Sequence, residues 1–183
     1  HRHGIIHDCL PTPEGIEVCR DYHIQMPMQS AFIGWKQEPD EYLARILGHD
    51  RLEKLNPIKT FRDHDIVVSF GSDAPCTTPD PIAWMDKAVN NGNADQAVSV
   101  QDALRMCTYN GAWAAFDERE RGSLEAGKIA DMAVLSENPY TVPKDKLKDI
   151  RVERLYLGGK PYESCRENIL PMMLRGLTSR NKA

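Results

Sequence analysis

Strand-like apolar runs alternate with helical patterns over about the first 115 residues of this chain. The clearest run is residues 66–70, which is rich in β-branched side chains and is followed by Gly71. Residues 4–7 and 23–26 predict two further strands, and we expect Pro27 to limit the hydrogen-bond ladder of the second. Apolar residues also recur at helical spacing, at residues 11–22, 39–48, 57–63 and 81–89. This alternation is typical of α/β folds with parallel strands.

Two local signals mark the end of this α/β part. Ser99 and Asp102 have the spacing of a capping box, which predicts a helix that begins just after Ser99. We expect a turn at Asn110–Gly111, before the last apolar stretch of this part.

The pattern changes after about residue 120, where glycines separate short strand candidates at residues 131–135 and 152–157. Gly158–Gly159 follows the second candidate and predicts a tight hairpin turn, which needs positive φ angles. We therefore expect a small β unit after the α/β part.

Composition excludes several classes of protein. The 183 residues are 41% hydrophobic and 27% charged, with a net charge of -4 and an isoelectric point near 5.9, so no nucleic-acid footprint is expected. No apolar run approaches the ~20 residues that span a bilayer, and the first residues do not predict a signal peptide. The five cysteines are scattered and form no CxxC pair, which favours reduced thiols and a cytoplasmic location.

Asp73 and His7 are the strongest candidates for chemistry. Asp73 follows the strand at residues 66–70, and His7 ends the strand at residues 4–7. Side chains just past the carboxyl ends of parallel strands lie where α/β proteins place reacting groups. Each residue alone could be structural, a turn-capping aspartate or a hydrogen-bonded histidine. Together, an imidazole and a carboxylate at the same end of two strands point to a metal site.

Weaker candidates surround this pair. His1 and His3 form an HxH whose side chains would share one face of a strand, but they lie at the chain terminus. Asp8 could orient a ligand or simply begin a loop. His64 precedes the strand at residues 66–70 and is expected at the end opposite Asp73. Trp35, in a loop after a strand, could contact substrate or could be a packing residue.

Residues 71–75 and 79–81 resemble the last-strand motif of the amidohydrolase superfamily, and most closely its amidohydrolase-3 type branch. That branch includes N-substituted formamide deformylase-like and exoenzyme-regulatory-like proteins. Residues 3–7, 103–114 and 122–131 agree with further family segments in the same order, so the resemblance extends to about residue 163. It implies strands six to eight of a (β/α)8 metal-dependent hydrolase barrel, plus part of a companion β-sandwich. The domain division would be 1–118 for the barrel part, 119–164 for the sandwich part and 165–183 for a tail.

Of the family's metal ligands, the resemblance maps only His7 and Asp73 onto this chain. The first-strand HxH pair, the mid-barrel lysine and the fifth-strand histidine would lie upstream, so His1 and His3 are not that HxH. The chain departs from the family at Gly4–Ile5–Ile6, where Arg-Ile-Glu is common, and at Gln29–Ser30, where Gln-Pro is common.

The implied reaction is hydrolysis of a small-molecule amide or another non-peptide C–N bond by metal-activated water, with Zn²⁺ or another divalent ion as cofactor. His7 would bind the metal, and Asp73 would bind it and transfer the proton. With two ligands, the chain alone is expected to be inactive. Two alternatives stay open: a non-catalytic module that forms a homo-oligomer through exposed strand edges, and a deaminase or cyclic-amide hydrolase on the same scaffold. For each of these three functions we expect the chain to form a homo-oligomer.

Overall fold

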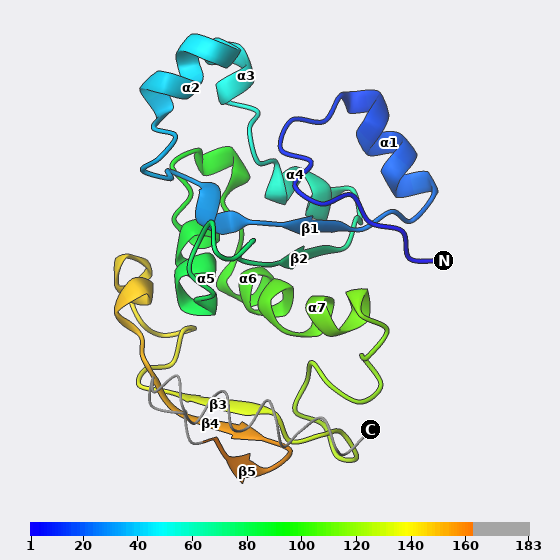
Figure 1. Cartoon of the computed structure of the whole chain (residues 1–183), viewed down its shortest axis with the longest axis vertical. Coiled ribbons are helices and arrows are strands. Elements are labelled where there is room, and N and C mark those ends of the chain that lie inside the picture. Colours follow the sequence, from blue (N-terminus) through cyan, green and yellow to red (C-terminus); the bar gives the residue numbers. More distant parts are fainter. Residues whose placement is uncertain (163–183) are drawn as a thin grey trace, which may run out of the picture.

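A computed structural model describes residues 1–162, and the predicted tail at residues 165–183 lies outside this range. The first part is mixed helix and strand (Figure 1). Its elements are α1 Pro13–Asp21, β1 Met26–Met28, η1 Ser30–Phe32, α2 Asp40–Leu47, α3 His49–Leu52, α4 Ile58–Asp63, β2 Val68–Phe70, α5 Pro81–Val89, η2 Ala94–Gln96, α6 Val100–Cys107 and α7 Tyr109–Ala114.

The second part is the small β unit expected from the sequence. Strands β3 Met132–Leu135, β4 Val152–Leu157 and β5 Lys160–Pro161 form an antiparallel sheet in that order, with η3 Lys144–Asp149 between β3 and β4. Gly158 and Gly159 join β4 to β5 with φ angles of 56° and 75°, which confirms the hairpin turn. In Figure 1 this sheet lies below the helices, away from β1 and β2.

Parallel pairing organises the first part. Strand β1 pairs with β2, with Met26 opposite Val68 and Met28 opposite Phe70. The segment before α1 joins the other edge of β1 through a parallel bridge between Gly4 and Gln25. The described residues thus supply three parallel segments in chain order, joined by helices. A closed barrel has eight, so the place of these segments in a barrel stays a prediction.

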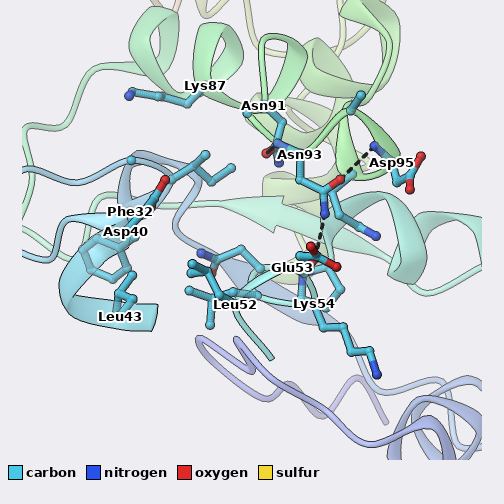
Figure 2. A pocket seen from close by; sticks show the side chains of 18 of the residues that line it. Phe32, Asp40, Leu43, Leu52, Glu53, Lys54, Lys87, Asn91, Asn93 and Asp95 are labelled. Atoms are coloured by element: carbon cyan, nitrogen blue, oxygen red, sulfur yellow. Dashed lines mark hydrogen bonds between the residues drawn. The ribbon is translucent and has the colours of Figure 1, made fainter. Parts of the chain in front are cut away.

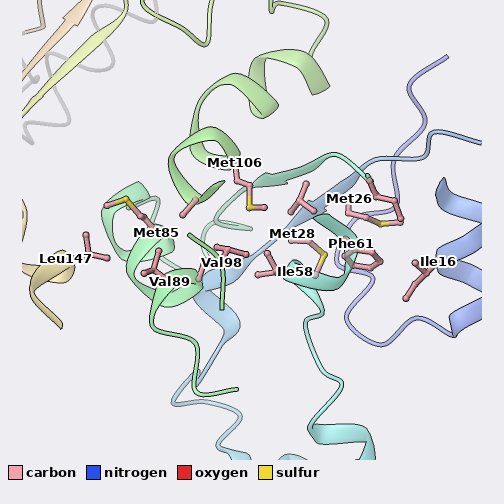
Figure 3. Packing of buried hydrophobic residues seen from close by; sticks show 14 of the residues in the cluster. Ile16, Met26, Met28, Ile58, Phe61, Met85, Val89, Val98, Met106 and Leu147 are labelled. Carbon is pink, nitrogen blue, oxygen red and sulfur yellow. The ribbon is translucent and has the colours of Figure 1, made fainter. Parts of the chain in front are cut away.

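The main core covers one face of this small sheet (Figure 3). Side chains alternate between the two faces of a strand, so Met26 and Met28 of β1 share a face with Val68 of β2. These three are at most 1% exposed. The cluster also includes buried residues of the surrounding helices, among them Ile58 and Phe61 of α4, Met85, Ala88 and Val89 of α5, and Ala103 and Met106 of α6.

Two expectations about element boundaries are wrong. Pro27 lies in the middle of β1 instead of limiting it. The carbonyl of Pro27 still accepts a hydrogen bond from the His7 backbone N–H, at 3.1 Å, so only the donor of this residue is lost. Asn110–Gly111 lies inside α7 and forms no turn, and the Asn110 side chain donates a hydrogen bond of 2.7 Å to the Val68 carbonyl of β2. That contact holds α7 against the sheet.

Among residues 1–162, no helix has both the length and the apolar character required to cross a membrane.

Candidate active site

The backbone of the first segment carries His7 to the carboxyl end of β1. Gln25 donates its N–H to the His3 carbonyl (2.8 Å), Ile5 donates to Gln25 (3.0 Å), and His7 donates to Pro27 (3.1 Å). This alternating pattern is that of a parallel ladder, but only Gly4 forms a regular bridge, so the prediction of a strand at residues 4–7 is wrong beyond Gly4. His7 therefore lies level with the end of β1, as the sequence predicted.

Asp73 is held in a loop that begins where β2 ends. The Gly71 N–H donates to the Met28 carbonyl of β1 (3.0 Å), which keeps the loop next to the neighbouring strand. The Ser72 hydroxyl accepts a hydrogen bond from the Ala74 N–H (3.1 Å), and the Asp73 carbonyl accepts one from the Cys76 N–H (2.9 Å). These short-range bonds fix the backbone around Asp73.

The structure brings the two predicted residues together. Nε2 of His7 and Oδ2 of Asp73 are 3.7 Å apart, and the side chains are 41% and 44% exposed. Ligand atoms about 2.1 Å from one tetrahedral zinc ion lie about 3.4 Å apart. The observed separation therefore suits two neighbouring ligands of one divalent cation, and both donor atoms are types that such ions bind.

Both residues have backbones in the left-handed region, with φ of 74° at His7 and 52° at Asp73. Histidine and aspartate tolerate this region better than most residues. A left-handed residue that is not glycine still costs about 1–3 kcal/mol, and such residues cluster at functional sites.

An aromatic row leads away from this pair. The His7 ring stacks on Phe32 of η1, with centroids 5.8 Å apart and an interplanar angle of 19°. Phe32 in turn meets Trp35 at 5.0 Å. The Ser30 hydroxyl anchors η1 because it donates to the Trp84 carbonyl of α5 at 2.9 Å.

Trp35 lines a pocket of about 610 Å³ that adjoins the Asp73 loop. The wall on the loop side is formed by residues 74–79, and α5 contributes Trp84 and Lys87. The aromatic row thus connects the His7–Asp73 pair to this pocket. Trp35 is therefore in position to contact a substrate, as the sequence suggested, and that role stays a prediction.

A larger cavity of about 1000 Å³ lies next to α2, α3 and η2 (Figure 2). Its walls come from the α2–α3 excursion and from the loop around η2, where the Asn93 amide donates to the Glu53 carbonyl at 2.6 Å. Its lining includes Phe32 but neither His7 nor Asp73. The smaller pocket is not lined by His7 or Asp73 either, but it adjoins Asp73 through Ala74 and Pro75 and is the candidate substrate pocket.

The other sequence candidates lie outside the pair. Nε2 of His64 lies 3.6 Å from Oε1 of Glu17. His64 precedes β2 and therefore lies at the end of the strand opposite Asp73, as expected. His1 and His3 have ring centroids 5.6 Å apart at the far end of the first segment. Burial raises the pKa of the Asp8 carboxyl above its ordinary value. Within residues 1–162, no three metal-binding side chains gather at one point.

Thiol chemistry is not supported at Cys107. Burial raises the pKa of Cys107 to about 12, so its thiol stays protonated at neutral pH.

The sequence analysis named Gln29 only as part of a departure from the family pattern and did not make it a site candidate. This residue directly follows β1, is 7% exposed, and has a side-chain oxygen with no hydrogen-bond partner among the described residues. Its position one residue past a strand, at the same end as His7 and Asp73, was a signal available in the sequence. Its burial was not.

The model of the amidohydrolase family matches residues 1–162. An N-substituted formamide deformylase from Arthrobacter pascens is 32% identical over 152 residues, which cover 79% of this chain and 26% of the relative. A 5-methylthioadenosine/S-adenosylhomocysteine deaminase from Caldanaerobacter subterraneus is 33% identical over 102 residues, covering 50% of this chain and 23% of the relative.

A solved structure agrees with these matches. A metal-dependent hydrolase from Pyrococcus horikoshii OT3 superposes with a TM-score of 0.68 at 25% identity, over 78% of this chain and 30% of that one. The chain therefore spans about a quarter to a third of the length of the proteins that it matches.

Proposed function

This chain belongs to the amidohydrolase family, and we propose that it is the carboxyl-terminal part of a longer enzyme that hydrolyses an amide-type C–N bond of a small molecule. The observation that carries the proposal is the 3.7 Å approach of His7 Nε2 and Asp73 Oδ2 at the carboxyl ends of neighbouring parallel segments. In this proposal residues 1–118 supply strands six to eight of a (β/α)8 barrel, and residues 119–164 supply part of a β-sandwich.

His7 and Asp73 have distinct roles in the proposed reaction. The neutral imidazole of His7 offers the lone pair of Nε2 to Zn²⁺ or another divalent ion, and the Asp73 carboxylate offers one oxygen to it. When bound, such an ion acts as a Lewis acid and makes water easier to deprotonate. The remaining ligands would come from outside the described residues, since His7 and Asp73 are only two.

Asp73 would also move the proton. Water adds to the carbonyl carbon as the carboxylate takes one of its protons, and Asp73 then gives that proton to the leaving nitrogen as the C–N bond breaks. The products are a carboxylic acid and an amine. The exposure of Asp73, 44% for its side chain, leaves room for water and substrate to reach it.

Trp35 would contact the part of the substrate remote from the reacting bond. The pocket beside Asp73 combines the Trp35 and Trp84 rings with the Lys87 side chain. Aromatic walls suit apolar substituents, which bury area against the rings. This supports a substituted amide over a small polar one.

A deaminase is the second candidate function. The similarity to a 5-methylthioadenosine/S-adenosylhomocysteine deaminase over half of this chain favours it, and the two reactions could share His7 and Asp73. The released product separates them: a deaminase frees ammonia from an amino-substituted ring, whereas an amide hydrolase frees an amine and an acid.

The test uses the enzyme expressed from the complete reading frame that contains this chain, loaded with zinc. We expect hydrolysis of N-substituted amides, and Asp73→Asn should lower kcat by about 10²–10⁴-fold because it removes the proton carrier. Activity is followed as amine release.

Asp65→Asn is the matched control. Asp65 is also a left-handed aspartate, with a φ of 58°, but it precedes β2 at the opposite end. It should retain wild-type kcat. Equal losses in the two variants, or amine release that survives Asp73→Asn, would contradict the proposed role of Asp73.

A further inference from the structure

The side chain of Gln29 is buried, and its amide oxygen accepts no hydrogen bond from the described residues. The residue is 7% exposed, and Oε1 has no hydrogen-bond partner among the described residues. Buried polar groups are almost always hydrogen-bonded, and each exception in a folded protein calls for an explanation. An unmet acceptor next to reacting groups suggests that a donor arrives with a ligand.

The sheet directs this amide to the reacting end. Gln29 directly follows β1, whose backbone pairs with His7 on one side and with Gly71 on the other. Gln29 lies between β1 and η1, in a backbone that already leaves the strand. Its Nε2 lies 3.7 Å from the point where a Cβ on Gly71 would stand, so the amide lies over the residue two positions before Asp73.

Gln25 directly precedes β1 and provides a comparison at the other end of the same strand. It lies four residues earlier, is 6% exposed, and its Oε1 also lacks a partner in the part of the chain that the structure describes. Its Nε2 donates to the Arg2 carbonyl at 3.3 Å, at the end of the segment opposite His7. Gln25 shares the burial and chemistry of Gln29 but not its position.

We infer that Gln29 Oε1 accepts a hydrogen bond from the N–H of the amide bond that is cleaved, and so selects secondary amides over N-methylated ones. This inference rests on the proposed hydrolysis and specifies its substrate class. An uncharged amide oxygen cannot take a proton, so it binds and orients and does not replace Asp73. A secondary amide presents one donor, its N–H, and that donor lies beside the bond being broken.

The test compares two substrates that differ by one methyl group, a secondary N-aryl formamide and its N-methyl counterpart. The zinc-loaded enzyme from the complete reading frame should show a higher kcat/KM for the secondary amide. Gln29→Leu should reduce the ratio of the two kcat/KM values by about tenfold or more, because a site built around a hydrogen bond rejects the analogue that lacks it.

Gln25→Leu is the matched control and should leave that ratio unchanged. If Gln29→Leu fails to fold, Gln29→Asn replaces it, since the shorter side chain withdraws the acceptor while it remains an amide. A structural role would lower kcat/KM for both substrates equally, and an unchanged ratio would therefore overturn the inference.

Failure of the proposed function gives a different result. If the wild-type enzyme hydrolyses neither amide, both the proposed function and this inference are wrong. If it hydrolyses both without discrimination, only the inference is wrong.

Discussion

Residue types and backbone angles together place the candidate catalytic groups. His7 and Asp73 both have positive φ, which is tolerable for their side chains and would be costlier for a β-branched residue. The sequence indicated both residues from their place after strands. It could not indicate that the left-handed turns would bring Nε2 and Oδ2 to 3.7 Å, because φ depends on the loop contacts that follow.

Arg2 contacts three residues between Trp113 and Glu118. Its guanidinium donates two hydrogen bonds to the Glu118 carboxylate, at 2.6 and 2.8 Å. It also lies over the rings of Trp113 and Phe116, 4.2 and 4.6 Å from their centroids. These contacts hold the beginning of the chain against the end of α7 and the residues that follow it. No local sequence pattern predicted them.

We predict a pH-dependent contribution of Glu118 to stability. The hydrogen bonds from Arg2 lower the pKa of the Glu118 carboxyl to about 2. A lowered pKa stabilises the folded chain fully above the unfolded value of about 4.3 and loses that effect as the pH falls through 2. Glu118→Gln should therefore be less stable than wild type at pH 7, and the difference should shrink below pH 4.3. Urea unfolding midpoints measured from pH 7 to pH 3 would report this.

Glu120→Gln removes the same charge from the same segment, and Glu120 forms no ion pair within residues 1–162. Its difference from wild type should be small at every pH. A Glu118→Gln difference that does not change with pH would contradict the assignment.

At the scale of elements, helices follow the local sequence closely and strands do so less. Helix α5 spans Pro81–Val89, the same residues as predicted, because Pro81 suits the first helical position and Asp80 caps it. The predicted strand at residues 23–26 appears as β1 Met26–Met28. Strand bounds depend on the partner strands, and the pairing of Pro27 with Ser69 outweighed the expected effect of proline.

We predict that the Asp80 cap stabilises the chain measurably. Its Oδ1 accepts hydrogen bonds from the backbone N–H groups of Ile82 and Ala83, at 3.0 and 3.3 Å. Asp80→Ala should lower the free energy of unfolding by about 1 kcal/mol. Helix α5 buries four residues in the body of the protein, so chemical denaturation monitored by far-ultraviolet circular dichroism should register the loss.

Asp40→Ala is the control for this cap. Asp40 occupies the first turn of α2, a helix that has no side-chain cap and buries no residue. Its substitution should change the free energy of unfolding by less than about 0.5 kcal/mol. Equal effects at the two positions would show that the cap is not the cause.

At the scale of the whole molecule, the described chain leaves apolar surface and strand edges open. Ile5 and Ile6 of the first segment are 42% and 62% exposed, and Leu155 and Leu157 of β4 are 36% and 48% exposed. Open strand edges and exposed apolar faces favour association with further chain. The expected homo-oligomer and the proposed longer enzyme both stay predictions that such surface supports.

We predict that the purified 183-residue chain retains no stoichiometric zinc after gel filtration at pH 7. Catalytic zinc sites in proteins use three protein ligands and water, and residues 1–162 bring only two candidate ligands together. Elemental analysis should give well below one zinc per chain. Close to one zinc per chain, lost on Asp73→Asn, would contradict this and would mean that the chain forms a complete site alone.

Local sequence was sufficient for the α/β part, the change to a β unit after about residue 120, the Ser99 helix cap and the Gly158–Gly159 turn. It was also sufficient to select His7 and Asp73 as candidates. These features depend on periodicity and hydrogen bonds within a few residues. The approach of His7 to Asp73, the buried acceptor of Gln29 and the clamp of Arg2 on Glu118 depend on which distant segments pair. Such contacts are set by the register of parallel strands and by packing across the sheet, and no short stretch of sequence encodes either.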